Sequence, residues 1–83
     1  MRKSLYTPGQ QKIAEQVRAM RVTAHLTQRG LAARLQRPLN VVSRIESGQR
    51  RVDLLEWIAL CEACGVDPVE SGRQMLNELM RGP

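Results

Sequence analysis

Aromatic side chains are almost absent from this chain of 83 residues. Phenylalanine does not occur, and the aromatic residues are Tyr6 and Trp57. Leucine, alanine, arginine, glutamine and glutamate are frequent instead, and these residues favour helices, whereas strands favour aromatic and β-branched residues. We therefore expect an all-α fold, in a single domain whose core is small.

Long apolar runs are also lacking. No segment approaches the roughly 18 apolar residues of a membrane span, and the first residues, MRKSLYTPG, lack the apolar core of a secretory signal. We see neither a long basic amphipathic helix nor a lipidation signal, which a membrane-surface role would need. We expect a cytoplasmic protein with no membrane partner.

Catalytic and metal-binding residues are scarce. With His25 as the single histidine and no glycine-rich phosphate loop, a nucleophile–base–acid set cannot be assembled, so we expect neither an enzyme nor a cofactor. Cys61 and Cys64 form C-E-A-C, but a zinc site usually needs four ligands. Because both cysteines lie in a periodic apolar run, we interpret them as small buried hydrophobes, not as metal ligands. A thiol-redox enzyme stays open only if Cys61 is exposed and acidic.

Acidic residues are rare in the first part of the chain. Residues 1–52 hold eleven Lys and Arg against Glu15 and Glu46, a local balance of +9, whereas residues 53–83 balance to −4. A basic surface confined to one part of a chain is typical of proteins that bind a polyanion. A solvated basic surface that only aids solubility is the alternative.

Apolar periodicity, caps and breakers predict five helices, or six if the C-terminal segment forms a separate short helix. The expected ranges are 8–22, 27–35, 38–46, 54–64 and 69–80. Thr27 and Asp53 are expected caps, and Gly48 an expected helix stop. In the first helix Ile13 and Met20 belong to the buried stripe, and Gln10 lies outside it.

The segment 38–46 has two distinct faces. At 100° per residue, Val41, Val42 and Ile45 fall on one arc. The opposite arc carries an aliphatic group, an amide, a hydroxyl and a guanidinium, from Leu39, Asn40, Ser43 and Arg44. Such a face is suited to reading base edges, because asparagine can pair with adenine and arginine with guanine. Taken alone, the segment also fits an ordinary amphipathic surface helix.

Four sequence blocks decide between these interpretations: LTQ at 26–28, LA at 31–32, VSRIESG at 42–48 and GV at 65–66. In this order and spacing, residues 10–68 resemble the lambda-repressor and Cro-type helix-turn-helix family, also called XRE-type. The resemblance implies a compact lambda-repressor-like helix-turn-helix domain. It also implies that the four residues of the polar arc face the major groove of DNA.

The same resemblance implies further roles. Gln28 approaches a phosphate at the start of the second helix, and the loop Gln49-Arg50-Arg51 flanks the DNA backbone. We add Arg37 to these expected phosphate contacts. Arg21 and Glu46 are expected to form a structural ion pair between the first helix and the end of the reading helix.

The turn before the reading helix departs from the family pattern. Gln36 stands where the family prefers glycine, Arg37 where it has a small hydrophobe, and Pro38 where it has a serine or threonine cap. The turn is therefore open to reshaping, and base preference cannot be inferred by analogy. Leu39, at a position that is often polar, favours contact with a thymine methyl group.

We therefore expect a sequence-specific DNA-binding transcriptional regulator. A homodimer would place two copies of helix 38–46 on a near-palindromic double-stranded operator. Phage or plasmid regulators, antitoxins and controllers of restriction-modification operons all fit, acting as repressor or autoregulator. The candidate dimer-interface residues are apolar and exposed-looking: Leu55, Met75, Leu79 and Met80.

The chain is accordingly divided into a basic arm at 1–7, the DNA-binding domain at 8–68 and a C-terminal helix or tail at 69–83 that is a candidate for dimerisation. The rival hypothesis is a protein-interaction adaptor of the same fold that docks a protein partner through the apolar region 54–80. A DNA reader should bind with strong salt dependence, whereas an adaptor would not bind DNA.

Overall fold

The computed structural model describes residues 7–81, and within this range it contains five α-helices and no strand. The helices are α1 (Pro8–Thr23), α2 (Gln28–Leu35), α3 (Leu39–Glu46), α4 (Leu54–Ala63) and α5 (Pro68–Arg81). The expectation of an all-α fold with five helices is confirmed, and the C-terminal segment is the fifth helix, not a sixth. Apart from Thr7, the expected N-terminal arm lies outside the described residues.

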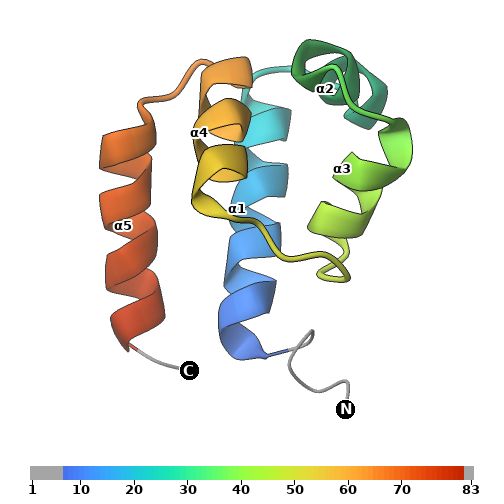
Figure 1. The fold of residues 1–83 in the computed structure, drawn as a ribbon. Helices are drawn as coiled ribbons and strands as arrows, with labels where there is room; N and C mark the ends of the chain where they lie inside the picture. The colour runs from blue at the N-terminus through green and yellow to red at the C-terminus, as the bar shows by residue number, and fades with distance from the viewer. Residues whose placement is uncertain (1–6, 82–83) are drawn as a thin grey trace.

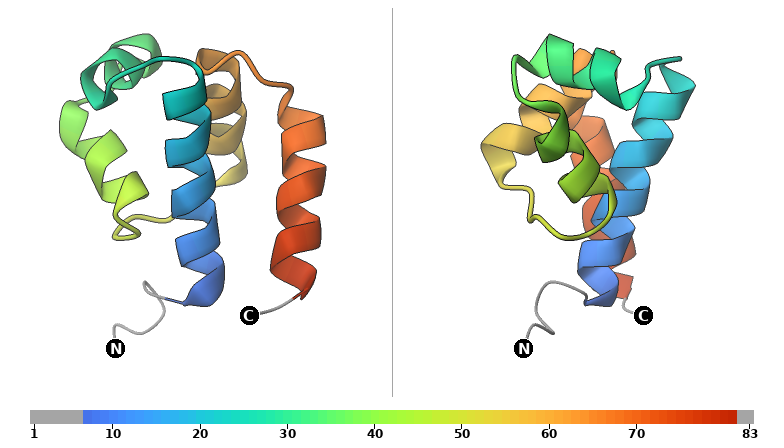
Figure 2. Two further views of the ribbon diagram at one scale, coloured as in Figure 1. Left: turned by 180° about the vertical axis from the view of Figure 1, so that it is seen from behind. Right: turned by 90° about the vertical axis from the view of Figure 1, so that its right-hand side faces the viewer.

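The helices are arranged around α1. Figure 1 shows α1 and α4 in the middle of the molecule, with α2 and α3 on one side and α5 on the other, and the view from behind in Figure 2 agrees. Helix α2 packs mainly against α3, α1 contacts both α3 and α5, and α4 contacts both α2 and α5. The α2–α3 pair and α5 therefore lie at opposite ends of the molecule.

The core takes side chains from every helix. Its largest fully buried members come from α1 to α4: Val17, Leu31, Val42, Ile45, Leu60 and Cys61. Helix α5 contributes Met75, which is 9% exposed. Ala32 is 4% exposed, and its small side chain permits α2 to pack closely against its neighbours.

Both cysteines belong to this core, as expected. Cys61 and Cys64 are free and buried, and the Sγ of Cys61 lies 3.9 Å from the Sδ of Met20. Burial raises the pKa of the Cys61 thiol to about 11, with a smaller contribution from Cys64. The condition for a thiol-redox enzyme, an exposed and acidic Cys61, is not met.

The helix starts are capped largely as the sequence predicts. The hydroxyl oxygen of Thr27 accepts a hydrogen bond from the N–H of Gly30 at 3.0 Å. The Asp53 carboxylate accepts from the N–H of Glu56 at 2.8 Å, and the Glu56 carboxylate accepts from the N–H of Asp53 at 3.3 Å. This reciprocal capping box fixes the first turn of α4 and, with it, the orientation of Glu56.

Two expectations about exposure were wrong. Gln10, placed on the outer face of the first helix, is 5% exposed, because its Nε2 donates to the carbonyl oxygen of Arg50 at 3.0 Å. Met75, a dimer-interface candidate chosen as exposed, is buried in the core, and Leu79 is partly buried against that core. The spacing of apolar residues along the sequence could not show that α1 and α4 cover this face of α5.

Candidate nucleic-acid interface

Helix α3 separates its residues into a packed face and an open face. Val42 and Ile45 are 0% and 2% exposed, whereas Asn40 and Arg44 are exposed and Leu39 is 36% exposed. The arcs predicted from helical angle are therefore those of the folded protein. The packed face fixes α3 to the core, and the open face presents an amide, a guanidinium and an aliphatic group to solvent.

Ser43 differs from the other members of the predicted reading face. It is partly buried, and its hydroxyl lies 3.4 Å and 3.3 Å from the carbonyl oxygens of Leu39 and Asn40, to which it donates. Serine often bonds its own helix backbone in this way. The hydroxyl can still accept a hydrogen bond, but donation to a base would require it to rotate.

The turn between α2 and α3 keeps a regular helix end despite its unusual sequence. Gln36 adopts the left-handed conformation, with φ 56° and ψ 43°, where the family prefers glycine. The N–H groups of Gln36 and Arg37 donate to the carbonyl oxygens of Ala33 and Ala32, both at 3.1 Å. These two bonds are the usual closure of a helix by a left-handed residue.

Pro38 precedes α3 instead of forming its first residue, which corrects the expected start at 38. It has extended backbone, with φ −62° and ψ 151°, and makes no side-chain cap. The helix therefore begins at Leu39, and the side chain of Leu39 is placed at its open N-terminal end.

Arg21 and Glu46 form the ion pair that the resemblance implies. The Nε and Nη2 of Arg21 donate to the two carboxylate oxygens of Glu46 at 2.7 Å and 3.0 Å, and its Nη1 donates to the carbonyl of Leu26 at 2.9 Å. The two side chains are only 12% and 4% exposed. The hydrogen bonds that Arg21 donates to Glu46 raise the pKa of Arg21, so the arginine stays charged. The pair joins the end of α1 to the end of α3.

Gln28 belongs to the same network. Its Nε2 donates to a carboxylate oxygen of Glu46 at 3.1 Å, so one amide hydrogen of this expected phosphate contact points inward. Only the second hydrogen of that amide is left for a phosphate.

The basic loop after α3 is held at both sides. The carbonyl oxygen of Arg44 accepts hydrogen bonds from the N–H groups of Gln49 and Arg50 at 2.9 Å and 3.2 Å. Gly48 makes this reversal with φ 80°, and Gln10 of α1 binds the carbonyl of Arg50 from the other side. The loop is thereby fixed beside the C-terminal end of the reading helix.

Sequence reasoning missed Glu56 in this region. Its Oε2 accepts a short ion-paired hydrogen bond from the Nη2 of Arg50 and lies 3.9 Å from the Nη1 of Arg37. The spacing Asp53-x-x-Glu56 predicts a capping box. It does not reveal which residues the second carboxylate oxygen meets, because that depends on how α4 packs beside α3.

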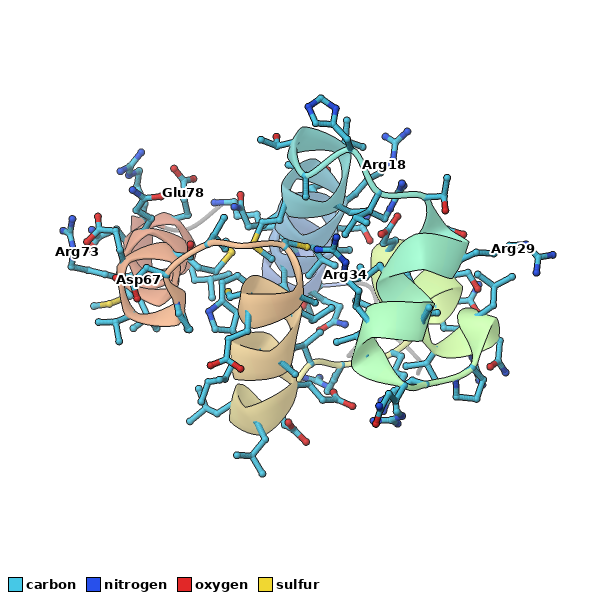
Figure 3. The ribbon with its side chains drawn as sticks, turned by 90° about the horizontal axis from the view of Figure 1, so that it is seen from above. Arg18, Arg29, Arg34, Asp67, Arg73 and Glu78 are labelled. Carbon is cyan, nitrogen blue, oxygen red and sulfur yellow. The ribbon has the colours of Figure 1, made fainter. Side chains whose placement is uncertain are left out.

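Part of the charge separation of the sequence is kept in the folded chain. Figure 3 shows Arg29 projecting at the α2 end, whereas Asp67, Arg73 and Glu78 lie around α5 at the other end. Arg34 turns inward instead, and its Nη1 donates to the carbonyl oxygen of Ala63 at 2.8 Å, which satisfies a helix-end carbonyl of α4. The separation is partial, because Glu56 pairs with Arg37 and Arg50, and Lys12 of α1 lies 4.0 Å from Glu78 of α5.

Apolar side chains gather on α4 and α5, away from α3. Leu54, Leu55 and Met80 are 82%, 79% and 82% exposed, and Leu76 is 59% exposed. A groove of about 350 Å³ lies between the start of α4 and α5, with Trp57 in its lining. Large exposed apolar groups at one place are typical of a contact surface.

Two negative findings concern the described part of the chain. No group of three or more His, Cys, Asp and Glu within residues 7–81 is arranged to hold a metal ion. Among the helices described, none has the length and apolar character needed to cross a membrane.

Comparison with known proteins gives a consistent result. Residues 12–74 match the family described as "Helix-turn-helix domain". An XRE-family like protein from Pseudomonas syringae pv. tomato str. DC3000 is 34% identical, with a TM-score of 0.72 over 90% of this chain and 88% of that one. The restriction-modification controller protein C.AhdI from Aeromonas hydrophila is 30% identical, with a TM-score of 0.68 over 74% of this chain and 92% of that one.

The fold is shared more widely. The restriction-modification controller protein C.Esp1396I, solved as a tetramer in complex with its natural operator, has a TM-score of 0.76 at 18% identity, over 89% of this chain and 97% of that one. At this identity the likeness concerns the fold alone. No curated protein matches the chain.

Proposed function

The chain belongs to the XRE-type helix-turn-helix family, and from this we propose that it is a sequence-specific DNA-binding transcriptional regulator that inserts α3 into the major groove. The observation that carries the proposal is the open face of α3. Asn40 and Arg44 are exposed on a helix whose opposite side buries Val42 and Ile45, so the backbone that carries the two side chains is held against the core.

We assign the residues of the interface to two roles. Asn40 and Arg44 read bases by paired hydrogen bonds, Leu39 contacts a thymine methyl group, and Ser43 contributes as an acceptor. The second group positions the protein on the phosphate backbone and comprises Gln28, Arg37, Gln49, Arg50 and Arg51.

Selection of bound sites from random duplex DNA tests the proposal, followed by the same selection with Asn40→Ala and Arg44→Ala. Each substitution should remove preference at particular base positions and cost about 1–3 kcal/mol of binding free energy on the selected site. Because both residues are exposed, unfolding should change by less than about 0.5 kcal/mol. Arg73→Ala, which removes the same charge from α5, is the matched control and should leave base preference intact.

We propose that the regulator acts as a homodimer, joined through the apolar face of α4 and α5. The molecule measures 31 × 29 × 20 Å. Half-sites one helical turn apart require each α3 to lie roughly 17 Å from the dyad, about half the length of the molecule. Leu55 and Met80 remain interface candidates, together with Leu54 and Leu76. We therefore propose residues 8–68 for DNA reading and residues 69–83 for dimerisation. The start of α4 lies in the first segment but also contributes to the dimer interface.

The regulator class is a further proposal. Controllers of restriction-modification operons are among the classes expected from the sequence, and the similarity to C.AhdI supports them. Such a protein acts where the DNA is, so we propose a cytoplasmic location. A gel shift on the chain's own promoter region tests this assignment, and equal affinity for scrambled DNA would count against it.

The exposed apolar face also supports the rival, a protein-interaction adaptor without DNA affinity. Salt dependence separates the two. A DNA reader with 6–10 phosphate contacts loses roughly 10³–10⁵ in affinity between about 50 and 200 mM salt. An adaptor would show no DNA binding at low salt. We propose no enzymatic activity for either case.

A further inference from the structure

Glu56 occupies an unusual place for a carboxylate in a DNA-binding surface. It lies at the start of α4, and its side chain is 17% exposed. Its two partners come from different segments, because Arg37 belongs to the turn before the reading helix and Arg50 to the loop after it. One acidic group thus meets a basic group from each side of α3.

The remaining contacts of Glu56 hold it in this position. One carboxylate oxygen accepts from the N–H of Asp53, which is part of the capping box, and the other faces the two guanidinium groups. The carboxylate is therefore oriented by the backbone of α4 and not by the arginines alone. An oriented, partly desolvated carboxylate competes for a guanidinium more effectively than a fully exposed one.

We propose that Glu56 is a positioning residue that acts as a built-in competitor of the DNA phosphates for Arg37 and Arg50. This inference rests on the proposed DNA-binding function. While Glu56 is paired with the two arginines, it offsets their charge and repels a nearby phosphate. Glu56 thereby lowers the sequence-independent affinity for DNA. The base contacts of Asn40 and Arg44 are unaffected, so they determine which sequences are bound.

Glu56→Gln is a suitable test, because glutamine serves as well as glutamate in a capping box and removes only the charge. The measurement is the affinity for random-sequence duplex DNA as a function of salt. Each phosphate contact contributes about 0.9 to the slope of log K against log[salt]. We expect Glu56→Gln to steepen this slope by about 1–2 units, since up to two arginines are released to phosphates. Affinity at the low-salt end should rise correspondingly, by about 3.5-fold per released contact for a fourfold difference in salt.

Two controls separate this effect from simpler ones. Glu70→Gln removes the same charge on α5, where Glu70 pairs with Arg73 on an exposed surface, and it should leave the slope unchanged. In a background of Arg37→Gln and Arg50→Gln, the substitution Glu56→Gln should give no gain. Circular dichroism and thermal unfolding establish that every variant is folded.

The outcomes are distinct. If the wild-type protein retains no DNA at low salt, the proposed function and this inference both fail. If the wild type binds DNA but Glu56→Gln leaves slope and affinity unchanged, or lowers them, the proposed function stands and the role of Glu56 is wrong. A gain of equal size in Glu70→Gln, or one that persists without both arginines, would reduce the effect to net charge and also overturn the inference.

Discussion

At the scale of single residues, Gln36 carries the largest conformational cost near the reading helix. A residue with a Cβ pays about 1–2 kcal/mol in the left-handed conformation, and glycine pays almost none. Gln36 adopts it with φ 56° because the hydrogen bonds that end α2 require it there. The turn thus has a left-handed helix end although Gln36 stands where the family prefers glycine, at the expense of stability.

Gln36→Gly should raise the free energy of unfolding by up to about 1 kcal/mol. Glycine relieves the strain of the left-handed conformation in the folded protein. It also raises the backbone entropy of the unfolded chain, which opposes folding and offsets part of this gain. Urea denaturation measures the change. Gln36→Ala keeps the Cβ and should not stabilise, so equal stabilisation by both substitutions would show that the glutamine side chain, not its backbone, is unfavourable.

The buried thiol of Cys61 makes stability depend on pH at alkaline values. Its pKa is raised from 9.0 to about 11 by burial, so above pH 9 the unfolded chain loses this proton before the folded protein does. The unfolded state then binds fewer protons, and the free energy of unfolding falls as pH rises from about 9 to about 11. Cys61→Ala should lower stability below about pH 9 and make the decline above it shallower. Denaturation at a series of pH values tests it, and parallel curves for the two proteins would contradict it.

At the scale of elements, the orientation of α3 depends on contacts at both of its ends. The turn at Gln36 sets where the helix starts, and the Arg21–Glu46 pair ties its last turn to α1 and to the start of α2. Both side chains of the pair are nearly buried, so each depends on the other to offset its desolvation. The reading face is thus positioned largely by Gln36, Arg21 and Glu46, which are not among the proposed DNA contacts.

Glu46→Ala should lower the free energy of unfolding by about 3–5 kcal/mol, because it leaves the nearly buried Arg21 without its counter-charge. Glu70→Ala, which removes a partner of Arg73 on the exposed surface of α5, should leave stability almost unchanged, because solvent screens exposed ion pairs. Thermal and urea unfolding of the two variants give the comparison. Similar small losses in both would mean that the Arg21–Glu46 pair does not stabilise the fold.

At the scale of the whole molecule, two surfaces lie on different sides of one small core. The proposed reading surface is on α3, and the exposed apolar groups are on α4 and α5, so a second copy can bind without covering α3 (Figure 1). The core between them is shared by all five helices. The two surfaces therefore keep a fixed spacing, which a two-fold operator requires.

Leu55→Gln should convert the proposed dimer into a monomer of 9.4 kDa at micromolar concentration, as measured by light scattering. Since Leu55 is 79% exposed, the substitution removes little packing within one chain, and the folded monomer should remain. Val22→Gln changes an apolar residue that is 53% exposed on α1, which is not part of the proposed interface, and should leave the proposed dimer intact. An unchanged mass in Leu55→Gln would place the interface elsewhere.

The sequence by itself determined the helices and the division of α3 into two faces. The 3.6-residue period of a helix places Val42 and Ile45 on one side and Asn40 and Arg44 on the other. This period does not depend on which neighbours the helix packs against. Caps such as Thr27 and Asp53 are equally local, since they act within one turn of their own helix.

Only the tertiary structure decided which neighbours those residues meet. Gln10 and Met75 are buried, and Glu56 faces Arg37 and Arg50, because helices distant in sequence are packed side by side. A local pattern does not show which partner a buried amide, thioether or carboxylate will meet. The role of such a side chain depends on its neighbours in the folded protein. Packing between helices brings these neighbours together from distant parts of the sequence.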